Sequence, residues 1–277
     1  MTAVLVENLH KSYHEHEALR GVSFEIREGE VFSLLGPNGA GKTTTIEILE
    51  GYRRRDSGSV EVLGADPARP TSKWRARIGV VLQSSAMYEN LTVRESLALF
   101  GGYYERPRPV DEVVDVVGLG EKAHTTVRKL SGGQRRRLDL GLALVGDPEL
   151  IFLDEPTTGF DPAARRTAWE TIRSLRELGK TILLTTHYLD EAEQLADRVA
   201  VLRDGRIVAT GTPADLTSTP ATEIRYRENG REVVLRTEEP TRVLAELTAR
   251  ALERGEELLD LEVRRPSLEE VYLELTE

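Results

Sequence analysis

The sequence predicts an α/β fold whose core is a parallel sheet with helices on its faces. Four short apolar runs recur along the chain with helical patterns between them: "EVFSLLG" (30–36), "RIGVVL" (77–82), "ELIFLD" (149–154) and "TILLTT" (181–186). Continuous apolar strands that alternate with helices are typical of a parallel sheet buried on both faces. The chain has 277 residues, of which 39% are hydrophobic, enough for one large domain and a small appendage.

The first predicted elements are antiparallel strands at the N-terminus. Val22, Phe24 and Ile26 alternate with polar residues, the pattern of a strand with one buried face. The run "EVFSLLG" then ends at a glycine-rich loop, and "KTTTIEILEGY" has a helical pattern. A strand, a loop and a helix therefore follow one another.

The middle of the chain predicts a helical subdomain over about residues 84–146. In it, Thr92 and Glu95 have the spacing of a capping box ahead of an apolar helix. After the last buried strand, "RVAVLRDGRIVATG" predicts a hairpin that turns at Asp204-Gly205.

A change of pattern predicts a main domain over residues 1–219 and a small α+β domain over residues 220–277. Strands at "EIRYR" and "REVVLR" are joined by a turn at 228–230, then come a helix over 244–252, "LLDLEV" and a last helix, "SLEEVYLELT". One face of that helix is apolar, which predicts a core of its own. The residues of this face are Leu268, Val271, Tyr272 and Leu275.

Composition excludes several kinds of site. The chain has no cysteine, which rules out disulfides and thiolate metal sites and is typical of an intracellular, reducing compartment. The formal net charge of −10 disfavours nucleic-acid binding over the whole surface, although a local basic patch stays open. The N-terminus lacks the layout of a signal peptide, and no apolar run approaches the about 20 residues that cross a bilayer.

Residues 36–43 match the phosphate-binding pattern G-x-x-x-x-G-K-[ST] between a strand and a helix. The predicted cradle consists of Gly36, Pro37, Asn38, Gly39, Ala40, Gly41, Lys42 and Thr43. Its backbone N–H groups and the helix N-terminus favour phosphate, Lys42 is expected to reach the β- and γ-phosphates, and Thr43 to bind Mg²⁺. A plain glycine-rich turn would not explain the lysine and the threonine.

Asp154 and Glu155 end a buried strand, at the edge of the sheet where α/β proteins bind ligands. Asp154 is suited to hold Mg²⁺, directly or through water, and Glu155 to polarise the water that attacks the γ-phosphate. A helix cap before a proline turn is the alternative, and it explains only one of the two carboxylates. His187 follows another strand in the same manner. A lone histidine at such a place is more often structural, so its predicted role in the site depends on the position that it shares with Asp154 and Glu155.

The stretch "LSGGQ" opens a helix that is predicted to run toward Val145. Ser131 can cap that helix. Gly132 and Gly133 in the first turn each cost about 1 kcal/mol relative to alanine, and exposed amides at a helix start attract an anion. The stretch therefore predicts a second phosphate site.

Six motifs in this order, "GPNGAGKTT", Gln83 after a strand, "LSGGQ", "LIFLDEP", "TGFDP" and "TTH", resemble the nucleotide-binding subunit of an ABC transporter. The resemblance implies a P-loop NTPase (ABC ATPase) fold that binds ATP with Mg²⁺ and hydrolyses it. The segments "TTHYLDEAEQLADRVAVL" and "RRPSLEEVYLELTE" are similar, more narrowly, to ATPase subunits of ABC-2-type exporters, including those that expel antibiotics or other lipophilic compounds.

The same resemblance implies roles for single residues. Tyr13 would stack on adenine, with an exposed turn tyrosine as the alternative, and Gln83 would sense Mg²⁺ and move with the helical subdomain. His187 would contact the γ-phosphate, and Asp161 would communicate across paired subunits. The remaining implied nucleotide contacts are Thr44, at the cradle, and Ser131, Gly132, Gly133 and Gln134, which would face the ATP of the other subunit. Phe160 departs from the leucine that is usual in the family, which affects only the fine geometry of its loop.

The implied partners are integral membrane permease subunits and a second ATPase copy, with a homodimer expected, at the cytoplasmic face of the cell membrane. Nucleic acid is not expected, because the arginines at 53–55 and 135–137 are interpreted as solvated helix faces. Two alternatives remain beside a non-transport ABC ATPase. A regulatory protein that holds ATP without hydrolysis would not need Glu155, and a small-molecule kinase would not need "LSGGQ".

Overall fold

The computed structural model describes residues 1–81, 88–217, 222–228, 231–255 and 257–264. The chain divides into two compact units, Met1–Thr210 and Gly211–Glu277, called the first and second unit below. The predictions for Gln83, for the turn at 229–230 and for the apolar face of the last helix lie outside the described residues.

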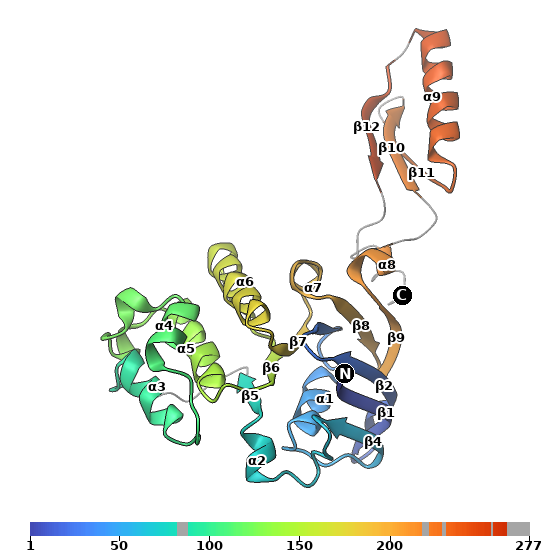
Figure 1. The fold of residues 1–277 in the computed structure, drawn as a ribbon. Helices are drawn as coiled ribbons and strands as arrows, with labels where there is room; N and C mark the ends of the chain where they lie inside the picture. Colours follow the sequence, from blue (N-terminus) through green and yellow to red (C-terminus); the bar gives the residue numbers. More distant parts are fainter. Residues whose placement is uncertain (82–87, 218–221, 229–230, 256, 265–277) are drawn as a thin grey trace. The chain divides into compact units, whose positions relative to one another are not determined.

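The first unit is built on a six-stranded sheet with the order β5-β6-β7-β3-β8-β9 (Figure 1). These strands are β3 (Val31–Leu35), β5 (Ile78–Val81), β6 (Leu150–Asp154), β7 (Thr181–Thr186), β8 (Arg198–Arg203) and β9 (Arg206–Gly211). β3 and β5–β8 are parallel, which confirms the predicted core. At the β8–β9 turn, Asp204 and Gly205 have φ of 47° and 75°, positive as a type I′ hairpin turn requires.

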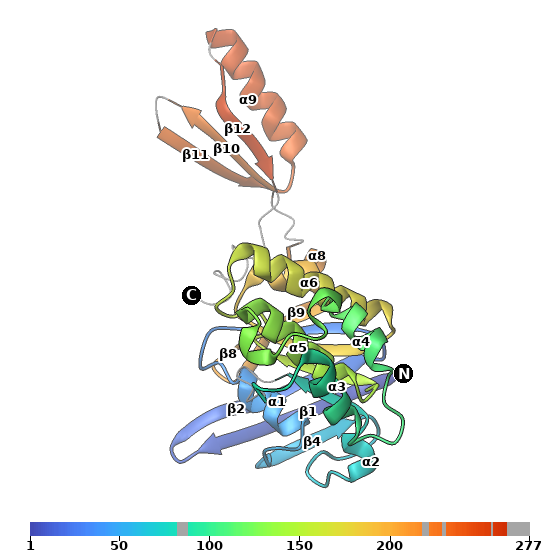
Figure 2. The same cartoon turned by 90° about the vertical axis from the view of Figure 1, so that its left-hand side faces the viewer.

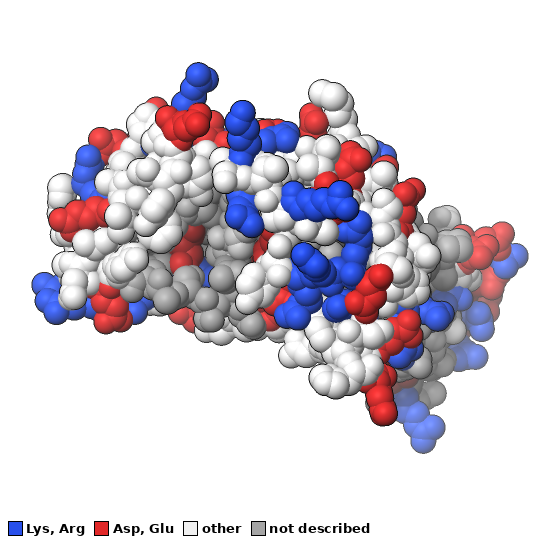
Figure 3. Space-filling model, turned by 90° about the horizontal axis from the view of Figure 1, so that it is seen from below, with Lys and Arg blue, Asp and Glu red and all other residues white. Residues whose placement is uncertain are grey.

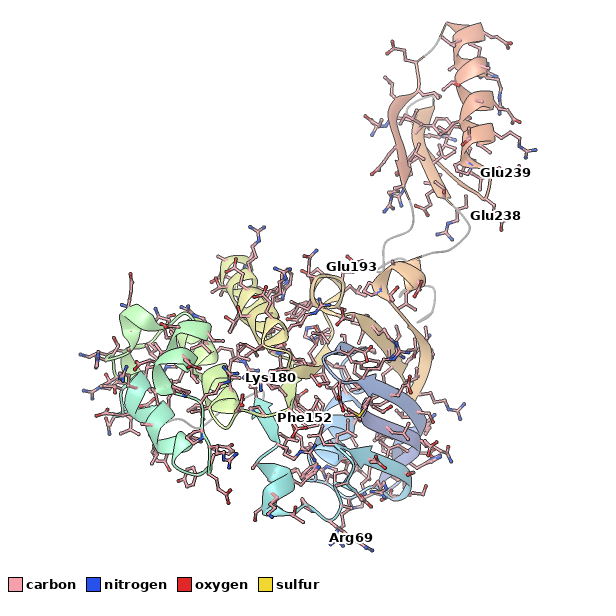
Figure 4. All side chains as sticks on the ribbon, viewed as in Figure 1. Arg69, Phe152, Lys180, Glu193, Glu238 and Glu239 are labelled. Carbon is pink, nitrogen blue, oxygen red and sulfur yellow. The ribbon has the colours of Figure 1, made fainter. Side chains whose placement is uncertain are left out.

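A second, antiparallel sheet of the first unit has the order β2-β1-β4, as predicted for the N-terminus. Its strands are β1 (Thr2–Tyr13), β2 (His16–Arg27) and β4 (Ser57–Val62). Helix α1 (Lys42–Leu49) shares one apolar cluster with both sheets, in which Phe152 of β6 is fully buried (Figure 4). This packing fixes the start of α1 against the carboxyl end of β3.

Helices cover the other face of the parallel sheet. Their bounds are α3 (Val93–Gly101), α4 (Val110–Val116), α5 (Gly132–Leu144), α6 (Pro162–Glu177) and α7 (Leu189–Leu195), with short helices η1 (Gly120–Lys122) and η2 (Val127–Lys129). The short helix α2 (Ser72–Arg75) instead packs its Trp74 into the apolar cluster of α1. Helices α3, α4 and α5 gather at one side of this unit, where the helical subdomain was predicted (Figure 1). The capping box of Thr92 and Glu95 is present at the start of α3. A continuous apolar cluster joins these helices to Ile151, Leu153 and Ile182 of the sheet.

The second unit contains a three-stranded antiparallel sheet with the order β11-β10-β12, packed against one helix (Figure 2). Its elements are α8 (Pro213–Thr217), β10 (Thr222–Glu228), β11 (Arg231–Thr237), α9 (Pro240–Arg254) and β12 (Leu259–Arg264). Ile224, Tyr226 and Leu247 form its buried core. Helix α9 starts before the predicted residue 244 because Pro240 is a favoured first helical residue.

Both charge signs are mixed over the surface that Figure 3 shows, with a local gathering of lysine and arginine side chains. Within the described residues, no helix is both long and apolar enough to cross a membrane.

Candidate functional site

The predicted phosphate cradle is a tight loop between β3 and α1. At Gly36 an added Cβ would lie 2.3 Å from the carbonyl oxygen of Leu202, so no larger residue has room there. Gly41 precedes α1 with φ of 108°, a backbone conformation that side-chain-bearing residues rarely adopt. The two glycines let the loop turn closely, which leaves backbone N–H groups at the helix start for an anion.

Lys42, Glu155 and His187, the three residues predicted to be catalytic, come together at the carboxyl ends of β3, β6 and β7. Lys42 Nζ lies 3.2 Å from Glu155 Oε1, and His187 Nδ1 lies 3.5 Å from the same oxygen. Lys42 is only 4% exposed and also donates to the carbonyl oxygens of Gly36 (2.8 Å) and Pro37 (3.2 Å). The lysine therefore joins the cradle to the acidic strand end.

Glu155 is held in a strained conformation. Its φ of 46° lies in the left-handed region, which costs a residue other than glycine about 1 to 3 kcal/mol. Its backbone N–H donates to Thr185 Oγ1 at 3.0 Å, and Thr158 Oγ1 donates to its Oε2 at 3.1 Å. Strain that neighbouring contacts maintain is typical of functional sites.

The carboxyl of Glu155 is ionised at neutral pH. Burial alone would raise its pKa, but Lys42, Thr158 and His187 together outweigh burial and hold the pKa below its usual range. A general base must be ionised to accept a proton, so these surroundings suit the predicted role.

His187 has an unsatisfied ring nitrogen. Its Nδ1 is buried and has no hydrogen-bond partner among the described residues, since the 3.5 Å approach to Glu155 lacks hydrogen-bond geometry. A buried polar atom without a partner loses free energy unless a ligand or water pairs with it. A ligand bound beside Glu155 could supply the missing partner.

Asp154 and Thr43 supply the oxygen atoms that suit Mg²⁺. Asp154 is 6% exposed, and its Oδ1 accepts a hydrogen bond of 2.6 Å from Thr185 Oγ1, which fixes the carboxylate. The described residues contain no group of three or more His, Asp or Glu side chains that could hold a metal ion by themselves. One carboxylate and one hydroxyl nevertheless fit Mg²⁺, which usually binds few protein oxygens together with phosphates and water.

Tyr13 lies at the end of β1 beside the cradle. Its hydroxyl is 3.4 Å from Thr44 Oγ1 on α1. Two cations lie over its ring, Arg53 at 5.0 Å and Lys11 at 5.6 Å from the ring centroid. The residue is therefore a half-buried part of the cradle's surroundings rather than an exposed turn tyrosine.

The stretch "LSGGQ" starts helix α5, away from the Lys42 cluster in sequence and beside the start of α6. Ser131 accepts a hydrogen bond from the N–H of Gln134, and the Gln134 side chain accepts one from the N–H of Ser131, which makes a capping box. An added Cβ on Gly133 would lie 3.7 Å from Ala164 of α6, an ordinary contact. Asp161 caps α6 through the N–H groups of Ala163 and Ala164.

The packing of the described residues does not require the two glycines of this stretch. No described atom lies within 4 Å of a Cβ added to Gly132, and Gly133 has room for one. Their cost of about 1 kcal/mol each in a helix is therefore not offset inside the described chain. A bare helix start with a serine and two glycines suits a ligand from outside the chain.

The interpretation of the arginine triplets as solvated helix faces is wrong for residues 53–55, which follow the end of α1 at Leu49 and lie in no helix, and it is wrong for Arg136. Arg136, on α5, is only 7% exposed. Its guanidinium donates to the carbonyl oxygens of Asp154 and Pro156. Helical periodicity alone contained no sign of this burial.

The sequence also missed a buried acid behind the site. Glu191 of α7 is fully buried, accepts hydrogen bonds from Thr157 (2.7 Å) and Trp169 (3.1 Å), and has a pKa raised by that burial. These contacts join the loop after Glu155 to the helix after His187. Nothing in its stretch "LDEAEQL" set it apart from the neighbouring acids Asp190 and Glu193.

Two family models match the chain. One, described as ABC transporter, covers residues 19–158. The other, described as the C-terminal domain of ABC transporter domain-containing proteins, covers residues 208–267. Together they span both units.

Two of three curated relatives cover nearly the whole chain, and the third covers about three quarters of it. A daunorubicin resistance ATP-binding protein from Streptomyces coeruleorubidus is 39% identical over 99% of this chain and 96% of its own length. A linearmycin resistance ATP-binding protein from Bacillus subtilis is 35% identical over 98% and 97%. A Nod factor export ATP-binding protein from Paraburkholderia xenovorans is 45% identical over 77% and 72%.

Solved structures share the fold. An ATP-binding subunit of an ABC transporter covers 99% of this chain and 100% of its own, with a TM-score of 0.73 and 26% identity. A dimeric ATP-binding cassette bound to ADP and phosphate covers 76% of this chain and 98% of its own, with a TM-score of 0.66 and 26% identity.

Proposed function

Because this chain belongs to the ATP-binding family of ABC transporters, we propose that it is the ATP-hydrolysing subunit that energises an exporter of an antibiotic, drug or other lipophilic compound. The convergence of Lys42, Glu155 and His187 at one sheet edge is the observation that carries this proposal. The relatives are named for antibiotic resistance and for Nod factor export, which supports outward transport and a cargo of this class.

Nucleotide binding starts at the cradle. The N–H groups before α1 would hold the phosphates, and Lys42 would exchange its contacts with Gly36 and Pro37 for the β- and γ-phosphates. Tyr13 would stack on adenine beside Thr44. Thr43 and Asp154 would hold Mg²⁺, which, when bound, neutralises phosphate charge.

Hydrolysis would depend on Glu155 and His187. When Lys42 turns to the phosphates, Glu155 would keep its hydrogen bond from Thr158 and its strained backbone, and its carboxylate would accept a proton from the attacking water. The unpaired Nδ1 of His187 would contact the γ-phosphate. The alternatives are less well supported, because a regulatory ATP-binding protein has no need of an ionised carboxylate at this position.

A second copy would complete the site. The "LSGGQ" stretch, whose glycines the packing of the described chain does not require, would face ATP held by the partner copy. Asp161 beside it would contact the partner. ATP would favour the closed pair and hydrolysis the open pair, so the cycle would shift a membrane partner between two states. A dimeric relative with ADP and phosphate supports this arrangement.

Replacement of Ser131 by arginine tests the second site. Ser131→Arg is expected to leave ATP affinity of the isolated subunit unchanged and to lower turnover by about 100-fold or more, because it fills the helix start that would bind the partner's phosphate. Titration calorimetry and a phosphate-release assay measure the two effects. Thr92→Arg is the matched control, since it breaks an equivalent capping box and should retain turnover. Loss of ATP binding in Ser131→Arg would mean that Ser131 serves its own cradle.

The membrane partner is tested by isolating it with the chain. Affinity purification of the tagged chain from detergent-solubilised membranes is expected to bring along an integral membrane permease. The protein would then lie at the cytoplasmic face of the membrane as a peripheral subunit. Recovery of the chain without any membrane protein would favour a non-transport ABC ATPase.

A further inference from the structure

The loop that carries Glu155 is held from two sides. On one side, the hydroxyl of Thr185 on β7 accepts a hydrogen bond from the N–H of Glu155 and donates one to the carboxylate of Asp154. On the other side lies Arg136, from helix α5, which precedes β6 in the chain. Its Nε donates to the carbonyl oxygen of Pro156 at 3.0 Å, and its Nη2 donates to that of Asp154 at 3.3 Å. The two carbonyls flank Glu155.

Burial makes this contact unusual. A guanidinium that is only 7% exposed must find acceptors, because removal of a charge from water is costly unless it is paired. Asp139, one turn further along α5, lies 3.8 Å from Arg136 Nη1. Asp154 and Glu191 add negative charge around it. The planar fork of arginine can hold two carbonyls in fixed directions, which a lysine ammonium cannot do in the same way.

We infer that Arg136 is a positioning residue that fixes the strained Glu155 loop to the helix that begins with Ser131. The inference rests on the proposed function, in which Glu155 acts on the ATP of its own subunit and Ser131 on that of the partner. Arg136 then connects the two half-sites of one chain through a rigid helix. Engagement of ATP at the start of α5 is transmitted to Glu155 as a shift of the carbonyls beside it.

The test compares Arg136→Met with Arg137→Met. Both remove a guanidinium from α5, but among the described residues the hydrogen bond of Arg137 goes to the carbonyl oxygen of Gly118 and not to the loop of Glu155. Arg136→Met is expected to lower kcat by about 10- to 100-fold, since a displacement of about 1 Å at a catalytic group has that effect. The dissociation constant for ATP and the KM should change by less than about 2-fold, because the cradle keeps its contacts. Arg137→Met should retain kcat.

A second readout does not depend on turnover. Hydrogen exchange, followed by mass spectrometry on the peptide that spans residues 154–161, should be faster in Arg136→Met and unchanged in Arg137→Met. Arg136→Lys, which keeps the charge and part of the hydrogen bonding, should lie between wild type and Arg136→Met in both kcat and exchange.

Misfolding is separated from loss of positioning by the conservative variant and by a double variant. If Arg136→Met does not fold, the double variant Arg136→Met/Asp139→Asn takes its place in the comparison. The second change removes the carboxylate that would otherwise be left partly buried without the guanidinium. Wild-type kcat and exchange in a folded Arg136 variant would overturn the inference. A parallel fall of ATP affinity and kcat would overturn it as well, because positioning of Glu155 alone leaves binding intact. Failure of the proposed function is distinct, since Glu155→Gln would then keep its turnover.

Discussion

Glu155→Gln is expected to bind ATP normally and to lower turnover by about 100- to 10,000-fold, the range that general bases contribute. The amide keeps the size and the hydrogen-bond geometry of the carboxylate, including a contact with Thr158, but it cannot accept a proton from water. Bound ATP would then persist, and the closed pair of subunits should accumulate. Phosphate release and size-exclusion chromatography with ATP measure the two outcomes.

The control for this variant is Glu30→Gln. Glu30 is a buried glutamate, 7% exposed and paired with Arg198, at the start of the β3 region rather than at its carboxyl end. It should keep turnover, although it can lose some stability. Normal hydrolysis in Glu155→Gln would show that Glu155 is not the base and would leave the ionised carboxylate to another role.

Lys42→Ala is expected to weaken ATP binding by about 10- to 100-fold, which corresponds to the loss of one or two hydrogen bonds to a charged group. Removal of the ammonium also takes away a cation that holds the pKa of Glu155 low. The folded-state pKa of Glu155 should therefore rise in the variant. A carboxyl whose pKa is lower in the folded than in the unfolded protein stabilises the fold at pH values above the unfolded pKa. In wild type this stabilisation is lost as the pH falls through the folded pKa of Glu155. In Lys42→Ala the stabilisation by Glu155 should be smaller, because the two pKa values lie closer together.

Titration calorimetry with ATP, and acid unfolding followed by circular dichroism, measure these effects. Lys180→Ala is the matched control, because Lys180 is also a buried lysine with an ion pair, 2.7 Å from Asp147, but lies at the opposite end of β7 (Figure 4). It should leave ATP affinity unchanged. Wild-type affinity in Lys42→Ala would contradict the cradle as the phosphate site.

Much of the fold was readable from local pattern. Apolar runs with helical patterns between them predicted the parallel strands, alternation predicted the N-terminal antiparallel sheet, and Asp204-Gly205 predicted the hairpin of β8 and β9. These signals are local because strand burial and turn conformation are set by neighbouring residues. The start of α9 was misplaced by four residues, at Pro240 instead of 244, since helix ends are set by capping more than by apolar period.

Candidate site residues were predicted unevenly. Lys42, Asp154 and Glu155 occur in contiguous motifs beside strand ends, so their type and position were visible. Arg136 and Glu191 belong to no such pattern, and the sequence suggested a solvated arginine where the structure has a buried one. The place of Tyr13 beside the cradle was evident only from its contacts with Thr44 of α1 and with Arg53, which follows that helix.

The sequence by itself determined the elements, the phosphate loop and the acidic strand end, because each depends on residues that are adjacent in the chain. Only the tertiary structure decided that Lys42 and His187 both lie beside Oε1 of Glu155, and that Arg136 holds the carbonyls on either side of Glu155. Such contacts join residues up to 113 positions apart, from Lys42 to Glu155. They exist because parallel strands bring their carboxyl ends to one edge and because a buried charge must find its partners wherever the fold supplies them.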